Sequence, residues 1–198
     1  MKTVLQIEAS MFGEQGQSSQ LAAALAKVLL QPGDRLLERD LARDPVPHLT
    51  AARFAAFTTA PAERTAEQRG VVAQSDELIS ELREADVIVL GLPMYNFGIP
   101  STLKAYFDHV ARAGHTFRYT NTGPEGLLTG KKAYVLAARG GHYHGTPADT
   151  ETPYVRQFLA FLGIRDLEFI YAEGLAIGAE HKVKALDAAN INIARLAA

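Results

Sequence analysis

Short apolar runs alternate along the chain with stretches whose apolar residues recur at helical spacing. The apolar runs lie at residues 4–9, 35–41, 87–92, 133–138 and 167–171. The amphipathic stretches lie at residues 18–30, 65–84, 100–112, 152–162 and 186–196. This alternation predicts an α/β fold with five parallel strands, right-handed crossovers and helices on both faces of the sheet.

The strands differ in polarity, which indicates where each one lies in the sheet. Residues 87–92 carry no polar side chain, as expected for a central strand that helices cover on both faces. Residues 35–41 are more polar, as is typical of a strand near the sheet edge. Five strands in a chain of this length favour the doubly wound, flavodoxin-like order 2-1-3-4-5, and we expect residues 1–198 to form a single domain.

Several residues mark helix starts. Thr65 and Gln68 have the spacing of a capping box, which predicts a helix start at Thr65. Pro100 suits the first position of a helix, and Thr152-Pro153 predicts a further start with Thr152 as the cap. Residues 44–64 and 115–131 show no sustained periodicity, so we expect two long irregular connections that cover a binding site.

The composition excludes several kinds of chemistry. The chain has 20 Lys and Arg against 22 Asp and Glu, so it lacks the basic excess that nucleic-acid binding needs. It has no Cys, which excludes disulfides, thiolate metal sites and cysteine nucleophiles. No signal-peptide pattern and no apolar stretch long enough for a membrane span is present, so we expect a cytoplasmic protein with no membrane partner.

In a sheet of this order, ligands bind beyond the carboxyl ends of the strands, where the chain reverses between the first and third strands. The loop at residues 10–19 leads into a helix N-terminus, whose free amides can bind a phosphate. Ser10, Gln17 and Ser18 add side-chain donors to it. The loop has neither the P-loop nor the Rossmann glycine pattern, and it could equally serve only to cap the helix.

The loop at residues 93–100 follows the predicted central strand and is rich in large side chains. Met94, Tyr95 and Phe97 could lie against a flat ring system. The alternative is that they pack a tight turn in which Asn96 is only a turn residue.

The loop at residues 139–145 contains a glycine pair. Gly140 and Gly141 allow close approach of the backbone to a ligand, and their amides could donate to carbonyl oxygens of a ring. His142 and His144 have the spacing of a metal-binding pair, but no third ligand is evident nearby, so we predict no metal site.

Motifs across the whole chain carry a family resemblance. The most specific is PMYNF at 93–97, supported by LKAYFD at 103–108, TFRYT at 116–120, GPEGL at 123–127 and RGG at 139–141. In these motifs the chain resembles the FMN-dependent NADH-azoreductase family within the flavodoxin-like quinone reductases. The resemblance runs from the first strand to the last helix and implies one FMN-binding domain.

The resemblance implies a set of site residues. The FMN phosphate and ring would be held by Ser10, Gly16, Gln17, Ser18, Met94, Tyr95, Asn96, Phe97, Ala138, Arg139, Gly140 and Gly141. Tyr119 and Phe161 match positions that the family places near the flavin and the substrate. Two departures are visible, because Gly16 and Ala138 stand where the family commonly has serine.

The resemblance also implies the reaction. Hydride passes from NADH to the flavin N5, and a quinone or an aromatic azo compound is reduced after NAD has left, so the kinetics are ping-pong. No side chain is expected to act as a catalytic residue, because the cofactor carries the chemistry. The family is homodimeric with its sites at the interface. NADPH is a possible donor, since Arg64, Arg69 or Arg118 could reach a 2′-phosphate.

Two other functions fit the same topology. An electron-carrier flavoprotein would pass electrons between protein partners, but such carriers are usually strongly acidic and this chain has a net charge of -2. A phosphoacceptor domain needs an acidic residue at the end of the third strand, and residues 90–93 supply none.

Overall fold

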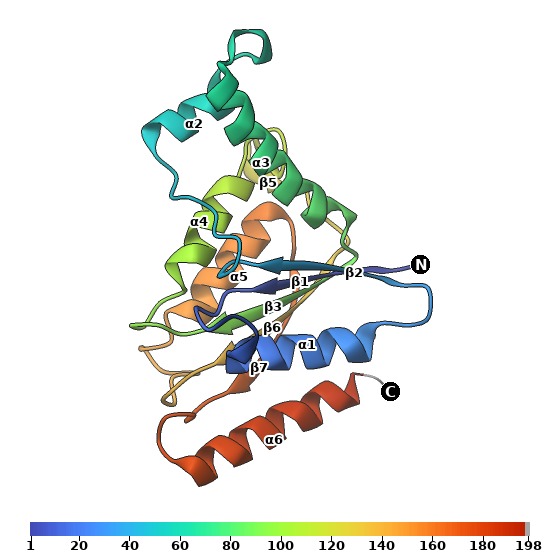
Figure 1. The fold of residues 1–198 in the computed structure, drawn as a ribbon, viewed down its shortest axis with the longest axis vertical. Helices are drawn as coiled ribbons and strands as arrows, with labels where there is room; N and C mark the ends of the chain where they lie inside the picture. The colour runs from blue at the N-terminus through green and yellow to red at the C-terminus, as the bar shows by residue number, and fades with distance from the viewer. Residues whose placement is uncertain (197–198) are drawn as a thin grey trace.

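The computed structural model describes residues 1–196, and a five-stranded parallel sheet lies at their centre (Figure 1). Its strands lie in the order β2-β1-β3-β6-β7. This is the predicted order when only the strands of this sheet are counted along the chain. The strand bounds are β1 Thr3–Glu8, β2 Arg35–Asp40, β3 Val87–Pro93, β6 Lys132–Ala138 and β7 Asp166–Ala172.

Helices cover both faces of the sheet, as predicted (Figure 1). Helices α1 (Gln17–Leu29) and α6 (Ala179–Arg195) pack on one face. Helices α3 (Ala66–Glu84), α4 (Ser101–Val110) and α5 (Glu151–Leu162) pack on the other. None of the helices described between residues 1 and 196 combines the length and the apolar character that crossing a bilayer requires.

Alternate side chains of the central strands enter the two cores. On β3, Val89 packs toward α1 and α6, whereas Ile88 and Leu90 pack toward α3, α4 and α5. All three are buried, because a strand between two helical layers has no solvated face. The polar β2 lies at the edge and, among residues 1–196, pairs with β1 alone, as its sequence predicts.

The predicted helix starts are partly confirmed. The capping box at α3 is present: the Thr65 hydroxyl accepts from the Gln68 amide at 3.2 Å, and the Gln68 side chain accepts from the Thr65 amide at 3.0 Å. Helix α4 begins one residue after Pro100. The predicted cap at Thr152 is wrong, because α5 begins at Glu151 and the Thr152 hydroxyl accepts a hydrogen bond from Arg139 instead.

The two connections expected to be irregular contain regular structure. The first holds α2 (Ala51–Thr58) and a short 3-10 turn at Pro61–Glu63. The second forms an antiparallel hairpin of β4 (Phe117–Thr120) and β5 (Gly123–Gly126). The pattern hides β5 because its residues, Gly-Pro-Glu-Gly, are depleted in strands.

This hairpin docks closely on the end of α5. The Leu128 amide donates to the Leu162 carbonyl at 2.8 Å, and Gly126 lies against the backbone of Gly163. A Cβ atom on Gly126 would overlap the Gly163 nitrogen. The close approach therefore requires glycine at position 126.

We predict that Gly126→Ala lowers the free energy of unfolding by about 1–3 kcal/mol, because backbone atoms cannot move aside as a flexible side chain can. Gly70→Ala is the matched control. Gly70 lies within α3 with open space around its Cα, so the alanine should raise stability by about 1 kcal/mol. Urea denaturation of both variants measures the two effects. Equal changes in the free energy of unfolding for the two variants would show that the hairpin does not depend on the contact between Gly126 and Gly163.

Candidate functional site

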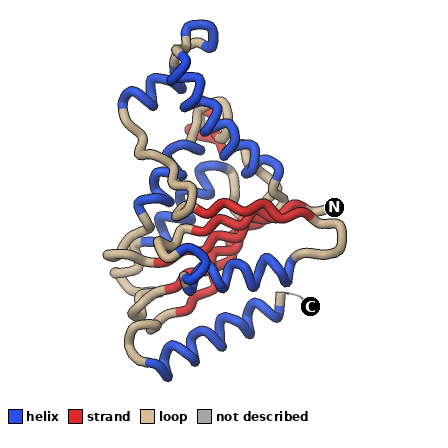
Figure 2. The backbone as a smooth tube through the Cα atoms, in the orientation of Figure 1, coloured by secondary structure: helices blue, strands red, loops and turns tan. Residues whose placement is uncertain are grey.

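The loops that follow β1, β3 and β6 meet at the carboxyl edge of the sheet, as predicted (Figure 2). Two contacts link them. The hydroxyls of Ser10 and Tyr95 lie 3.2 Å apart, which joins the first loop to the second. The Met94 amide donates to the Ala138 carbonyl at 3.2 Å, which joins the second loop to the end of β6. The three loops therefore form one surface.

The first loop leaves the N-terminus of α1 open. Gly16 is the N-cap residue and has no side chain to accept from the first-turn amides. The hydroxyl of Ser18, in that first turn, is buried and has no hydrogen-bond partner among residues 1–196. Open amides and an orphaned hydroxyl at one helix N-terminus suit an anion such as phosphate.

Packing explains why position 16 is glycine. A Cβ atom on Gly16 would overlap the side chain of Ser10, which fills that space. The Ser10 hydroxyl accepts from the Phe12 amide at 3.2 Å and lies against the Tyr95 hydroxyl. Serine at position 16 would require this arrangement to change.

The second loop is a tight turn with an unusual backbone. Tyr95 and Gly98 exchange two backbone hydrogen bonds, of 3.0 and 3.1 Å. The two residues between them are left-handed, with φ of 52° at Asn96 and 61° at Phe97. An aromatic residue in this region is strained, and such strain is concentrated at binding sites. The Phe97 side chain is 59% exposed.

The third loop presents backbone donors. The carbonyls of Arg139, Gly140 and Gly141 accept from amides of the loop after β7. The amides of Gly140 and Gly141 have no acceptor in the part of the chain that the structure describes. These two donors remain available to a ligand.

Arg139 lies beneath the third loop. Its guanidinium is fully buried and donates to Asp149 at 2.9 Å, to Thr152 at 3.1 Å and to Glu173 at 3.2 Å. Its Nε lies 3.4 Å from Glu151. Burial opposes the charged form, but the carboxylates outweigh it and raise the pKa of Arg139. The side chain therefore anchors the loop from within.

Sequence reasoning missed the three carboxylates of this cluster. Glu173 directly follows the fifth strand of the sheet, so its position at the carboxyl edge was a usable signal. Asp149 and Glu151 precede α5 or begin it, and the misplaced helix start concealed them.

Tyr119 and Phe161 do not join the three loops within this chain. Both pack on Phe117, with ring centroids 5.4 Å and 4.4 Å from it. Phe161 lies in the last turn of α5, whereas Glu151 begins that helix near the third loop. Ten residues of helix separate these positions by about 15 Å.

An apolar cavity of about 500 Å³ adjoins the second loop. Phe97 forms part of its wall, and Tyr154 of α5 forms another part. The other lining residues are His48, Gly98, Ile99, Ser101, Lys104 and Thr150. The cavity could accommodate a flat aromatic molecule beside the turn.

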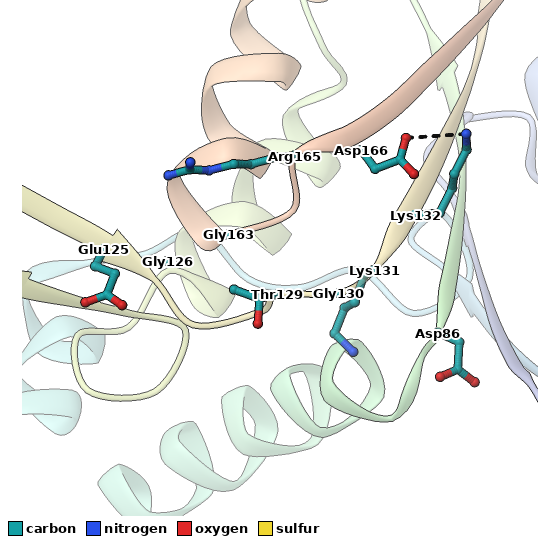
Figure 3. A pocket seen from close by; sticks show the side chains of 10 residues that line it. All are labelled: Asp86, Glu125, Gly126, Thr129, Gly130, Lys131, Lys132, Gly163, Arg165 and Asp166. Carbon is teal, nitrogen blue, oxygen red and sulfur yellow. Dashed lines mark ion pairs between the residues drawn. The ribbon is translucent and has the colours of Figure 1, made fainter.

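Another cavity, of about 670 Å³, lies at the opposite, amino edge of the sheet (Figure 3). None of the predicted site residues lines it. Its two lysines are engaged locally: Lys132 pairs with Asp166 at 3.4 Å, and Lys131 donates to the carbonyls of Arg83 and Ala85.

Known proteins match this chain over most of its length. A family model described as a flavodoxin-like fold matches residues 2–196. The "FMN-dependent NADH:quinone oxidoreductase" of Cellvibrio japonicus is 56% identical over 180 residues, covering 90% of each chain.

Two solved structures are also similar. An azoreductase of Bacillus anthracis strain Sterne superimposes with a TM-score of 0.88 at 31% identity, covering 100% of this chain and 99% of that one. A second structure, of an FMN-dependent NADH-azoreductase of Bacillus anthracis in complex with FMN, gives a TM-score of 0.88 at 28% identity over the whole of both chains.

Proposed function

This chain belongs to the flavodoxin-like fold family that includes FMN-dependent NADH:quinone oxidoreductases and azoreductases, and from that premise we propose how its own residues hold FMN. The protein is an FMN-dependent oxidoreductase that takes electrons from NADH and reduces quinones and aromatic azo compounds. The observation that carries the site assignment is that each of three adjoining loops has two backbone amides without an acceptor among the described residues. They belong to Gln17 and Ser18, to Asn96 and Phe97, and to Gly140 and Gly141. The assignment of individual residues is the proposal.

The FMN phosphate binds at the N-terminus of α1. Gln17 and Ser18 offer first-turn amides there, and the orphaned Ser18 hydroxyl supplies a further donor. The helix dipole favours the negative charge without a lysine. Gly16 contributes by leaving the amides uncapped, and Ser10 contributes by holding Tyr95 against this loop.

The isoalloxazine ring would be held by the second and third loops. Met94, Tyr95, Asn96 and Phe97 of the second loop would contact it. The free amides of Gly140 and Gly141, which follow Ala138 at the end of β6, would donate hydrogen bonds to it. Arg139 acts indirectly, because its side chain is buried beneath the loop.

When bound, FMN supplies hydride transfer at its ring, from NADH first and to the acceptor afterwards. The chain's own residues bind the cofactor, orient it and polarise its ring. Amide donors at the third loop favour negative charge on the ring of the reduced cofactor. No side chain is assigned as a catalytic residue.

The proposed donor is NADH. Each of the three arginines that could reach a 2′-phosphate is engaged elsewhere: Arg118 pairs with Glu125 at 2.8 Å, and Arg64 and Arg69 donate to backbone carbonyls. We therefore expect lower steady-state rates with NADPH than with NADH, and location in the cytoplasm stays a prediction.

The proposed active form is a homodimer with its sites at the interface. Tyr119 is 75% exposed and Phe54 is 57% exposed, and both line an aromatic cavity of about 270 Å³ away from the three loops. Within their own chain Tyr119 and Phe161 pack on Phe117, and Phe161 lies about 15 Å along α5 from Glu151, which is near the third loop. Association with a second copy could bring them to that copy's flavin.

We predict that the purified protein is yellow, releases FMN on denaturation, and oxidises NADH with a quinone or an azo dye as acceptor. Initial rates at several fixed acceptor concentrations should give parallel double-reciprocal lines, because both substrates use one site in turn. A colourless protein that stays inactive with added FMN would contradict the proposal.

Anaerobic mixing with NADH separates the enzyme from an electron carrier. Direct bleaching of the flavin is expected, since the protein itself accepts the hydride. Bleaching that needs a separate reductase would favour the carrier.

Gly141→Val should raise the Kd for FMN about tenfold, a loss of about 1.4 kcal/mol. A Cβ atom on Gly141 would lie 2.8 Å from the Tyr143 hydroxyl, so the Tyr143 side chain must move aside, and the branched valine would keep a ligand from approaching the backbone closely. Fluorescence titration of FMN measures the affinity, and urea denaturation checks that the variant folds. An unchanged Kd in a folded variant would remove Gly141 from the site.

Sedimentation should give a particle of twice the 21.4 kDa chain mass. Tyr119→Glu should shift it toward monomer, because a charge at the proposed interface is desolvated on association. Ile191→Glu is the control, since Ile191 is a similarly exposed apolar residue on α6. If Tyr119→Glu and Ile191→Glu give the same particle mass, the interface does not include Tyr119.

A further inference from the structure

One guanidinium beneath the third loop faces three shielded carboxyl groups. Arg139 pairs with Asp149, Glu151 and Glu173, whose side chains are 7%, 0% and 14% exposed. If all three carboxyls were ionised, this cluster would hold two uncompensated negative charges away from water. Such an arrangement is costly, and a buried carboxyl in it keeps its proton most readily.

Of the three carboxyl groups, Glu151 has the fewest hydrogen bonds. Neither of its oxygens has a hydrogen bond in the described structure, and its nearest cation is the Arg139 Nε at 3.4 Å. Burial raises the pKa of Glu151 to about 8, against the lowering effect of Arg139. By contrast, hydrogen bonds from Arg139 and Thr152 outweigh burial and lower the pKa of Asp149.

The cluster draws its charged and titratable groups from every element around it. Arg139 ends β6, Glu173 follows β7, and Glu151 begins α5. The remaining members are Asp149 before α5, His144 in the third loop at 3.5 Å from Asp149, Tyr171 on β7, and Arg156 on α5 near Tyr171.

Glu173 connects this cluster to the third loop. One of its oxygens, Oε1, accepts from Arg139 at 3.2 Å and from the amides of Tyr143 and His144 at 3.0 and 2.9 Å. The position of the loop therefore depends on which carboxylates accept hydrogen bonds from the Arg139 guanidinium. Gly140 and Gly141, the proposed ring contacts, lie directly between Arg139 and these anchored amides.

We propose that Glu151 is a positioning residue whose proton sets the geometry of the third loop and hence the affinity for FMN. While Glu151 is neutral, Arg139 donates hydrogen bonds to Asp149 and Glu173, and Glu173 accepts from the amides of the third loop. When Glu151 loses its proton to solvent, the new charge attracts the unpaired Arg139 Nε–H. The guanidinium then shifts away from Glu173 and loosens the loop. The inference rests on the proposed function, because it concerns the FMN site.

FMN titrations at pH 7, 8 and 9 test this effect. The FMN phosphate, with a second pKa of about 6, stays doubly charged over this range. The wild-type Kd should rise about fivefold or more from pH 7 to pH 9. Glu151→Gln mimics the neutral carboxyl and should keep its Kd constant within about twofold. Glu67→Gln, at an exposed carboxylate in the first turn of α3, should follow the wild type.

Thermal unfolding of the protein without FMN gives a second readout. Glu151 keeps its proton in the folded chain up to about pH 8 but loses it near its ordinary pKa when unfolded. Its contribution to stability is therefore present at low pH and lost as pH rises toward 8. Relative to Glu151→Gln, the wild-type Tm should fall by roughly 3 °C or more between pH 5 and pH 8.

The outcomes separate the two proposals. The same rise of Kd in Glu151→Gln and wild type, or a wild-type Kd that does not change, would overturn the role of Glu151. If the glutamine variant does not fold, Glu151→Leu provides a second neutral side chain with the same expected constant Kd. No FMN binding at pH 7 by the wild type would contradict the proposed function itself.

Discussion

The reversal of the chain between β1 and β3 is the constraint on which the rest of the structure depends. β1 pairs with β2 on one side and β3 on the other, and the helices that follow β1 and β3 pack on opposite faces. A crevice must remain where those two helices diverge. Since all five strands are parallel, the loops after β1, β3 and β6 reach this crevice whatever their sequences are.

Those loop sequences share one property, which is that each exposes backbone amides. The first loop does so through a glycine N-cap, the second through a left-handed turn, and the third through a glycine pair whose carbonyls are bonded behind it. Backbone donors need no cysteine, metal or ionised side chain. The absence of Cys from the chain therefore places no limit on a protein whose redox centre is a bound cofactor.

Much of the fold could be predicted because the buried strands and amphipathic helices have distinct periodicities. The loops of the site were located by topology, and the glycine pair and the turn residues by their residue types. The buried cluster under Arg139 was not predicted, because Glu173 lies far along the chain from Asp149 and Glu151, and only tertiary packing brings the three carboxylates together around Arg139. The hairpin at residues 117–126 was missed because its second strand, Gly-Pro-Glu-Gly, carries no β-forming side chain and is held in place by docking against α5.

The central claim is that FMN binds across the carboxyl edge through amides of all three loops. The most direct measurement is the change in backbone amide ¹H–¹⁵N resonances when FMN is added to the protein without cofactor. The account predicts the largest shifts at Gln17, Ser18, Asn96, Phe97, Gly140 and Gly141. Shifts centred instead on the amino-edge cavity, at Lys131, Lys132 and Arg165, would contradict it.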